Sequence, residues 1–198
     1  TPASFGNGDL WFDATAKGPS AYDAGIRRYL SGTLFAASAS ATVSNTTTET
    51  TILGTGIGTK TLPTNFFVAG RSIQVTVRGI YSTQAVPITF QIKVKLGATI
   101  ILDTGLQTPV GALANRYFEV SGIITCRTTG ASGTVFGQGM FLSSTSAVAA
   151  AHWDMENTAT ATIDTTAPQA VDVTAQWGVG VAAADTITGT NVLIEAVN

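Results

Sequence analysis

The stretch VPITFQIKVKLG, Val86–Gly97, decides the fold class of this chain. Polar residues at 89, 91, 93 and 95 alternate along it with an apolar set: Ile88, Phe90, Ile92, Val94 and Leu96. Successive side chains of a β-strand point to opposite faces. A period of two therefore predicts a strand with one face in a core and the other toward solvent.

The same alternation occurs on both sides of this stretch. RSIQVTVRGIY (71–81) sets Ile73, Val75 and Val77 against polar neighbours, and QAVDVTAQWGVG (169–180) sets Val171, Val173, Ala175, Trp177 and Val179 on one side. Further strands are predicted within 42–53, 64–70, 98–104, 116–129, 133–144 and 185–198. We therefore predict an all-β protein: an antiparallel jelly-roll β-sandwich of about eight strands, spanning 41–198.

Composition supports this fold class and limits the partners. Only 11% of residues are charged and the net charge is −2, while Thr, Ser, Gly and Ala are abundant. Threonine suits a pleated sheet better than a helix interior. A nucleic acid or an anionic membrane attracts concentrated Lys and Arg, so neither is an expected partner. Charge is depleted at interface cores, so a weakly charged surface indicates contact with other copies or other proteins.

Residues 1–40 differ from the rest and are predicted to form an N-terminal attachment arm. Their short apolar clusters, broken by Gly, Pro and Ser, are too short to close a core, and AKGPS (16–20) is a typical turn sequence. A ring buried on a partner contributes about 1.5–3 kcal/mol. Folding of the arm back onto its own sandwich is the alternative. The attachment residues are predicted to be Leu10, Trp11, Phe12, Tyr22, Tyr29 and Phe35.

Two stretches resemble bacteriophage virion proteins. GNGDLWFDATAKGPSAYDAGIRRYL (6–30) is similar to an element of fibre-like and capsid-attached phage proteins, and 42–83, with its LPTNFFVAGR, resembles the opening strands of jelly-roll modules in phage structural or tail proteins. The resemblance implies a trimeric jelly roll on the virion surface, displayed outward and held by an N-terminal arm. It leaves capsid decoration and tail-tip receptor binding unseparated.

The segment AHWDMEN (151–157) holds the only histidine and is the most reactive-looking part of the chain. On a strand, His152, Asp154 and Glu156 would share one face and could offer nitrogen and oxygen donors to a divalent ion. No further ligand is evident nearby, so we predict no metal site. We instead expect a loop between the strands at 133–144 and 169–180, whose His152, Trp153, Asp154 and Glu156 are candidate intersubunit or receptor contacts.

No other motif predicts chemistry. There is no G-x-S-x-G elbow, GTGIGTK (54–60) lacks the spacing of a phosphate loop and is expected to be a turn, and Cys126 is expected to be a buried small hydrophobe. We therefore expect no catalytic residue and no cofactor.

The sequence thus predicts a non-enzymatic virion structural protein, a homotrimer that decorates and stabilises the capsid by arm attachment and intersubunit burial. Its partner would be the major capsid protein or another virion protein. A receptor-binding tip domain of a tail fibre, recognising carbohydrate or protein, is the alternative.

Overall fold

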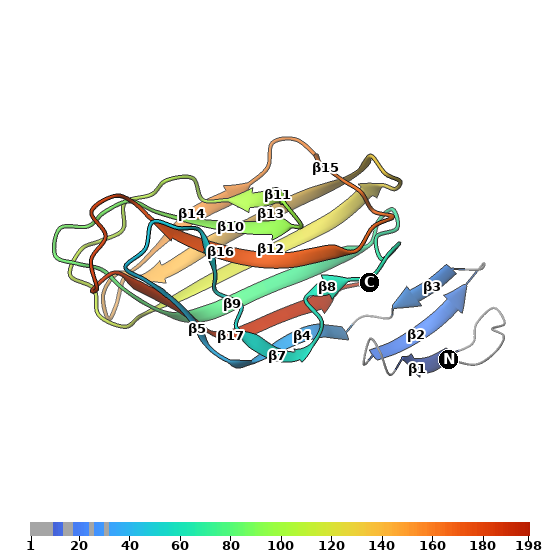
Figure 1. Ribbon diagram of the computed structural model, residues 1–198, viewed down its shortest axis with the longest axis horizontal. Coiled ribbons are helices and arrows are strands. Elements are labelled where there is room, and N and C mark those ends of the chain that lie inside the picture. Colours follow the sequence, from blue (N-terminus) through green and yellow to red (C-terminus); the bar gives the residue numbers. More distant parts are fainter. Residues whose placement is uncertain (1–9, 14–17, 24–25, 30–31) are drawn as a thin grey trace.

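The computed structural model describes residues 10–13, 18–23, 26–29 and 32–198, and these form strands and loops without a helix. From residue 32 onward two antiparallel sheets lie face to face, which confirms the predicted all-β sandwich (Figure 1). Because the described residues form no helix, they include none that is long and apolar enough to cross a membrane.

The larger sheet has nine strands in the order β14-β13-β12-β9-β17-β4-β7, with β15 beside β14 on β13 and β5 beside β4 on β17. All of its pairings are antiparallel. Its strands are β4 (Gly32–Ala39), β5 (Ala41–Ser44), β7 (Thr55–Gly58), β9 (Ser72–Ser82), β12 (Arg116–Thr128), β13 (Gly133–Ser144), β14 (Ala150–Glu156), β15 (Ala161–Ile163) and β17 (Thr186–Ala196).

The smaller sheet has five strands in the order β11-β10-β16-β6, with β8 also on β16. They are β6 (Thr50–Thr51), β8 (Thr61–Leu62), β10 (Phe90–Leu96), β11 (Thr99–Asp103) and β16 (Gln169–Trp177). The alternating stretch that decided the fold class forms β10, the strand beside β16, and its apolar residues from Phe90 to Leu96 are buried. The two sheets hold more strands than the predicted number of about eight, because several strands are only two to four residues long.

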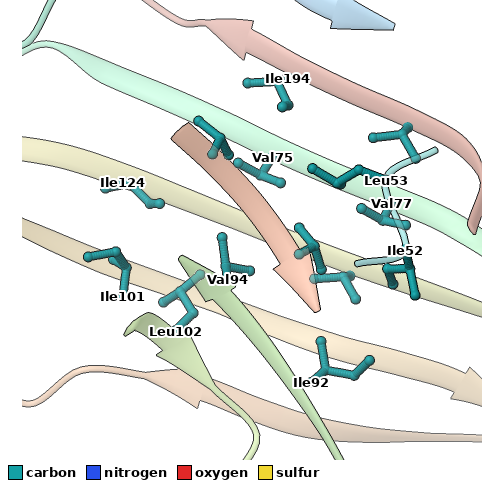
Figure 2. Close-up of a cluster of buried hydrophobic side chains, with 14 of the residues drawn as sticks. Ile52, Leu53, Val75, Val77, Ile92, Val94, Ile101, Leu102, Ile124 and Ile194 are labelled. Atoms are coloured by element: carbon teal, nitrogen blue, oxygen red, sulfur yellow. The ribbon is translucent and has the colours of Figure 1, made fainter. Parts of the chain in front are cut away.

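The core lies between the sheets. Val75 and Val77 of β9 and Ile124 of β12 face Ile92 and Val94 of β10 across it, as Figure 2 shows. Each comes from a strand predicted by its period of two. Cys126 is buried in the same core, as expected, and burial raises the pKa of its thiol.

Three glycines let the sheets approach closely where Leu102 of β11 meets β12 and β13. A Cβ on Gly122 would lie 2.4 Å from Leu102 Cδ1, and one on Gly137 would lie 2.7 Å from Ile101 Cγ2. A Cβ on Gly139 would lie 2.4 Å from the carbonyl oxygen of Ser121. Leu102 therefore packs against bare backbone, and side chains at these positions are excluded.

Two segments differ from their predicted conformation. Residues 64–70 form turns instead of a strand, although Phe66 is buried and Arg71 Nη1 donates to its carbonyl oxygen at 3.0 Å. Residues 55–58, expected to be a turn, form edge strand β7 on β4. Glycines explain this strand, since a Cβ on Gly56 would lie 2.0 Å from the Ala36 carbonyl oxygen.

The predicted boundary at residue 40 also changes. β4 belongs to the nine-stranded sheet, paired with β17 and β7, and Phe35 is only 2% exposed. Phe35 is thus a core residue rather than an attachment residue, and the sandwich begins at Gly32. β4 shows no period of two in the sequence, because Leu34 and Phe35 are both buried and only small residues follow them.

The described arm strands form a sheet of their own. β1 (Leu10–Asp13), β2 (Gly18–Asp23) and β3 (Ile26–Tyr29) pair antiparallel in that order. Side chains of the predicted attachment residues Leu10, Trp11, Phe12, Tyr22 and Tyr29 lie outside the described part of the structure.

Candidate functional site

The AHWDMEN segment forms β14, an edge strand of the nine-stranded sheet, rather than the predicted loop. It pairs with β13 in a register that sets His152 opposite Leu142 and Asp154 opposite Met140. The loop prediction is wrong, because the polar residues do not interrupt the strand pattern. Their alternation with Trp153 and Met155 is itself the period of a strand.

Trp153 faces the core and is not an exposed contact residue. Its ring stacks on Phe141 of β13 with centroids 4.9 Å apart and lies 5.7 Å from Phe90 of β10. Phe90 in turn lies 4.9 Å from Trp177. Trp153 therefore joins an aromatic cluster that ties both sheets together, and we withdraw it as a candidate contact.

His152, Asp154 and Glu156 point the other way and are exposed on the outer face of the nine-stranded sheet. The first and last residues of this series are about 13 Å apart along the strand, which is too far for all three groups to hold one ion. Among the residues that the structure describes, no group of three or more His, Cys, Asp or Glu side chains could hold a metal. These three residues remain candidates for an intermolecular contact.

That outer face carries exposed apolar side chains. We call Ile80, Tyr117, Ile123 and Met140 the outer patch; all four are exposed, and they lie on the adjacent strands β9, β12 and β13. Tyr117 and Ile80 are opposite one another in the pairing of β12 with β9. The alternation in the sequence places these side chains on the solvent side, but it does not show that they share one surface.

A hydrogen-bonded pair of charges lies beside the outer patch. Arg78 Nε donates to Glu119 Oε2 at 3.0 Å, and the Tyr117 hydroxyl donates to the same oxygen at 2.6 Å. Arg78 and Tyr117 together hold the pKa of Glu119 below its usual range. Burial and the neighbouring carboxylate raise the pKa of Tyr117.

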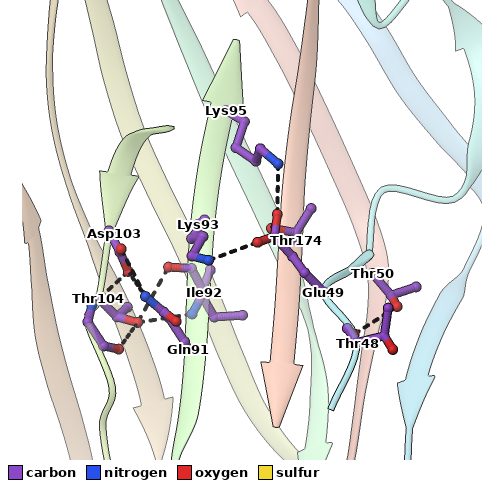
Figure 3. A network of polar contacts seen from close by, with 11 residues as sticks. Thr48, Glu49, Thr50, Gln91, Ile92, Lys93, Lys95, Asp103, Thr104 and Thr174 are labelled. Atoms are coloured by element: carbon purple, nitrogen blue, oxygen red, sulfur yellow. Dashed lines mark hydrogen bonds and ion pairs between the residues drawn. The ribbon is translucent and has the colours of Figure 1, made fainter. Parts of the chain in front are cut away.

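The outer face of the five-stranded sheet is of a different kind, because it carries a polar network around Glu49 (Figure 3). Lys93 Nζ and Lys95 Nζ each donate to one oxygen of Glu49 at 2.8 Å, and the Thr174 hydroxyl donates at 3.0 Å. The bonds from Lys93 and Lys95 lower the pKa of Glu49 to about 2. The network holds the segment before β6 against β10 and β16.

Four loops meet at the end of the sandwich that lies at the left in Figure 1. We call 83–89, 104–115, 145–149 and 178–185 the distal loops. They emerge together because the strands that they connect pair at those ends, as in Tyr81 with Arg116 and Phe90 with Trp177. Gly32, where the arm joins β4, pairs with Ala196 at the other end of β17.

The distal loops carry exposed aliphatic side chains and almost no charge. Val148 is 98% exposed and Val179 94% exposed, while the only charged residue in these loops is Asp185, which is fully buried. The predicted inner-face position of Val179 is wrong, because β16 ends at Trp177. The exposed set is Val86, Leu106, Val110, Val148 and Val179.

Hydrogen bonds interlock three of the distal loops. The Asp185 carboxylate accepts from the backbone N–H groups of Gln84 and Ala182, each at 2.9 Å. The Thr83 hydroxyl donates to the Val110 carbonyl oxygen at 2.8 Å and accepts from the Leu113 N–H at 3.1 Å. The distal loops are thus pre-organised, which reduces the ordering cost of binding.

Sequence reasoning missed the distal loops as a group. Apart from Val179, which follows the alternating pattern of 169–180, each aliphatic residue stands alone among small or polar residues and belongs to no periodic pattern. The available signal was the near absence of charge from four separate connections. That signal becomes meaningful only when the fold brings the connections together.

No family model, no curated protein and no solved structure matches this chain.

Proposed function

We propose that this protein is a non-enzymatic structural component of a bacteriophage particle, located on the virion surface. The arm attaches to the major capsid protein or another virion protein, and a homotrimer of sandwiches of jelly-roll type decorates and stabilises the shell. The observation that carries the proposal is the division of the chain into two hydrogen-bonded units. The described arm strands pair only with one another, and the sandwich closes its own core from residue 32.

The mechanism is cohesion by burial of apolar surface between neighbouring subunits. A stable specific interface buries more than about 1,000 Å² in total. The outer patch offers exposed apolar side chains outside the sandwich core. The proposal needs no cofactor, metal ion or catalytic residue.

Co-sedimentation with purified phage particles tests the attachment step. The full chain should pellet with particles that lack it, and a variant without residues 1–31 should fold and stay in the supernatant. Circular dichroism of the shortened variant provides the control for folding. Continued pelleting of the shortened variant would show that the sandwich, not the arm, makes the attachment.

A receptor-binding tip domain is the second candidate, favoured by the distal loops. They lie at the end of β17 opposite Gly32, where the arm joins, and present a rigid, uncharged, aliphatic surface. Loops at the far end of an anchored domain are well placed to meet a carbohydrate or protein on the host.

Binding to host cells separates the two candidates. A Val148→Asp/Val179→Asp double variant should lose cell binding if the distal loops recognise a receptor, whereas Val197→Asp, near the arm, should not. If the unaltered chain attaches to particles but does not bind host cells, only the capsid role remains.

A further inference from the structure

The two outer faces of the sandwich differ in a way that indicates which one is covered. The face of the five-stranded sheet holds the Glu49 network, in which Lys93 and Lys95 are both paired with the Glu49 carboxylate. The face of the nine-stranded sheet has Ile123 48% exposed and Met140 46% exposed near its centre. An antiparallel sheet that faces water on one side is normally polar there.

Charge on the nine-stranded face follows the pattern of an interface between identical copies. Near its centre, Arg78 and Glu119 neutralise one another, so identical copies can approach without like-charge repulsion. His152, Asp154 and Glu156 all lie on β14 at the edge of the sheet. Exposed apolar side chains around a neutralised charge pair, with further polar groups at one edge, are compatible with a protein–protein interface.

The face is also large enough. β13, β12, β9 and β17 have 12, 13, 11 and 11 residues. With strands about 4.8 Å apart and a rise of about 3.4 Å per residue, these four alone span roughly 770 Å². Adding β4 and β14 brings the face to about 1,000 Å². In a cyclic trimer each copy divides this face between two neighbours, so each interface buries about 1,000 Å² in total, which is the size that a specific interface needs.

We propose that the outer face of the nine-stranded sheet is the trimer interface, occupied by second and third copies of this chain. This inference rests on the homotrimer in the proposed function and names the surface that forms it. The three nine-stranded sheets face the threefold axis, so that the outer patch lies in the interior. A cyclic trimer uses heterologous contacts, and the β14 edge with His152 meets the β4–β7 side of the next copy.

Light scattering coupled to gel filtration of the full chain tests the interface. The unaltered protein should have three times the chain mass of 20.3 kDa. Ile123→Asp places a charge in the outer patch and should give a folded monomer, or raise the trimer dissociation constant at least tenfold. Val148→Asp, an equally drastic change at an exposed aliphatic residue of the distal loops, should remain trimeric.

A monomeric or dimeric unaltered protein would overturn the proposal, and so would an undiminished trimer of Ile123→Asp. If circular dichroism shows that Ile123→Asp is unfolded, the double variant Ile123→Thr/Met140→Gln decides, because threonine keeps the strand propensity. A trimer of unchanged stability in that variant would also overturn the proposal.

Particle co-sedimentation is measured separately on the same samples. A trimer that fails to pellet with particles would contradict the virion role and leave the interface standing. A monomer that pellets with particles would contradict the interface and leave arm attachment standing.

Discussion

Replacing Trp153 with alanine should destabilise the sandwich far more than replacing its neighbour His152. Truncation of a buried Phe or Trp to alanine costs about 3–5 kcal/mol. Trp153 is only partly buried, but it stacks on Phe141 and contacts Phe90. We therefore expect Trp153→Ala to lower the free energy of unfolding by about 2–3 kcal/mol. For a domain of this size, that loss lowers Tm by about 5–10 °C.

Thermal unfolding followed by circular dichroism measures this difference. His152→Ala is the matched control, since His152 is exposed on the same strand and surface substitutions change stability by about 0.5 kcal/mol or less. Both variants are measured at a concentration at which they share one oligomeric state, because association shifts Tm. Equal losses in the two variants, or a larger loss in His152→Ala, would refute the placement of Trp153 in the aromatic cluster.

Three further outcomes are expected. Folding lowers the pKa of Glu49 to about 2, so the stability that the ionised carboxylate contributes is present above its unfolded pKa and is lost as the pH falls. Urea titrations from pH 5 to pH 2 should therefore show an extra loss of about 1–2 kcal/mol in the free energy of unfolding that Glu49→Gln lacks. Identical pH profiles of the two proteins would contradict this expectation. Gly139→Ala should cost about 2–3 kcal/mol in the same titration, since its Cβ meets backbone at 2.4 Å; an unchanged midpoint would show that β12 and β13 can separate. A chain without residues 1–31 should stay soluble and show a folded spectrum in circular dichroism. A chain without residues 1–40 also loses β4 and should aggregate. A folded, soluble product of the longer deletion would show that β4 is dispensable.

The strands that make the core could be predicted from the sequence, because apolar and polar residues alternate along a strand that has one buried face. β9, β10 and β16 show this clearly at Val75, Ile92 and Val173. The face assigned to each side chain in 73–78 and 88–96 agrees with the observed burial, except that Thr76 is also buried.

Other features depend on contacts between distant residues and left no local signal. Phe66 is buried without a strand, since a turn lays its ring against the core. β7 is too short and too rich in glycine to show a period, and it exists because its glycines fit against β4. The shared face of His152, Asp154 and Glu156 agrees with the strand alternative for this segment, whereas the loop prediction is wrong.

The position of Gly32 has a consequence for mechanical load. Tension on a subunit held by its arm and bound through its distal loops would enter the sandwich at the first residue of β4. The hydrogen bonds of an antiparallel pair lie perpendicular to the strands. A pull along β4 therefore loads its bonds to β17 and β7 in shear, and they must break together instead of one by one. The strand that follows the arm is thus placed to resist detachment by force.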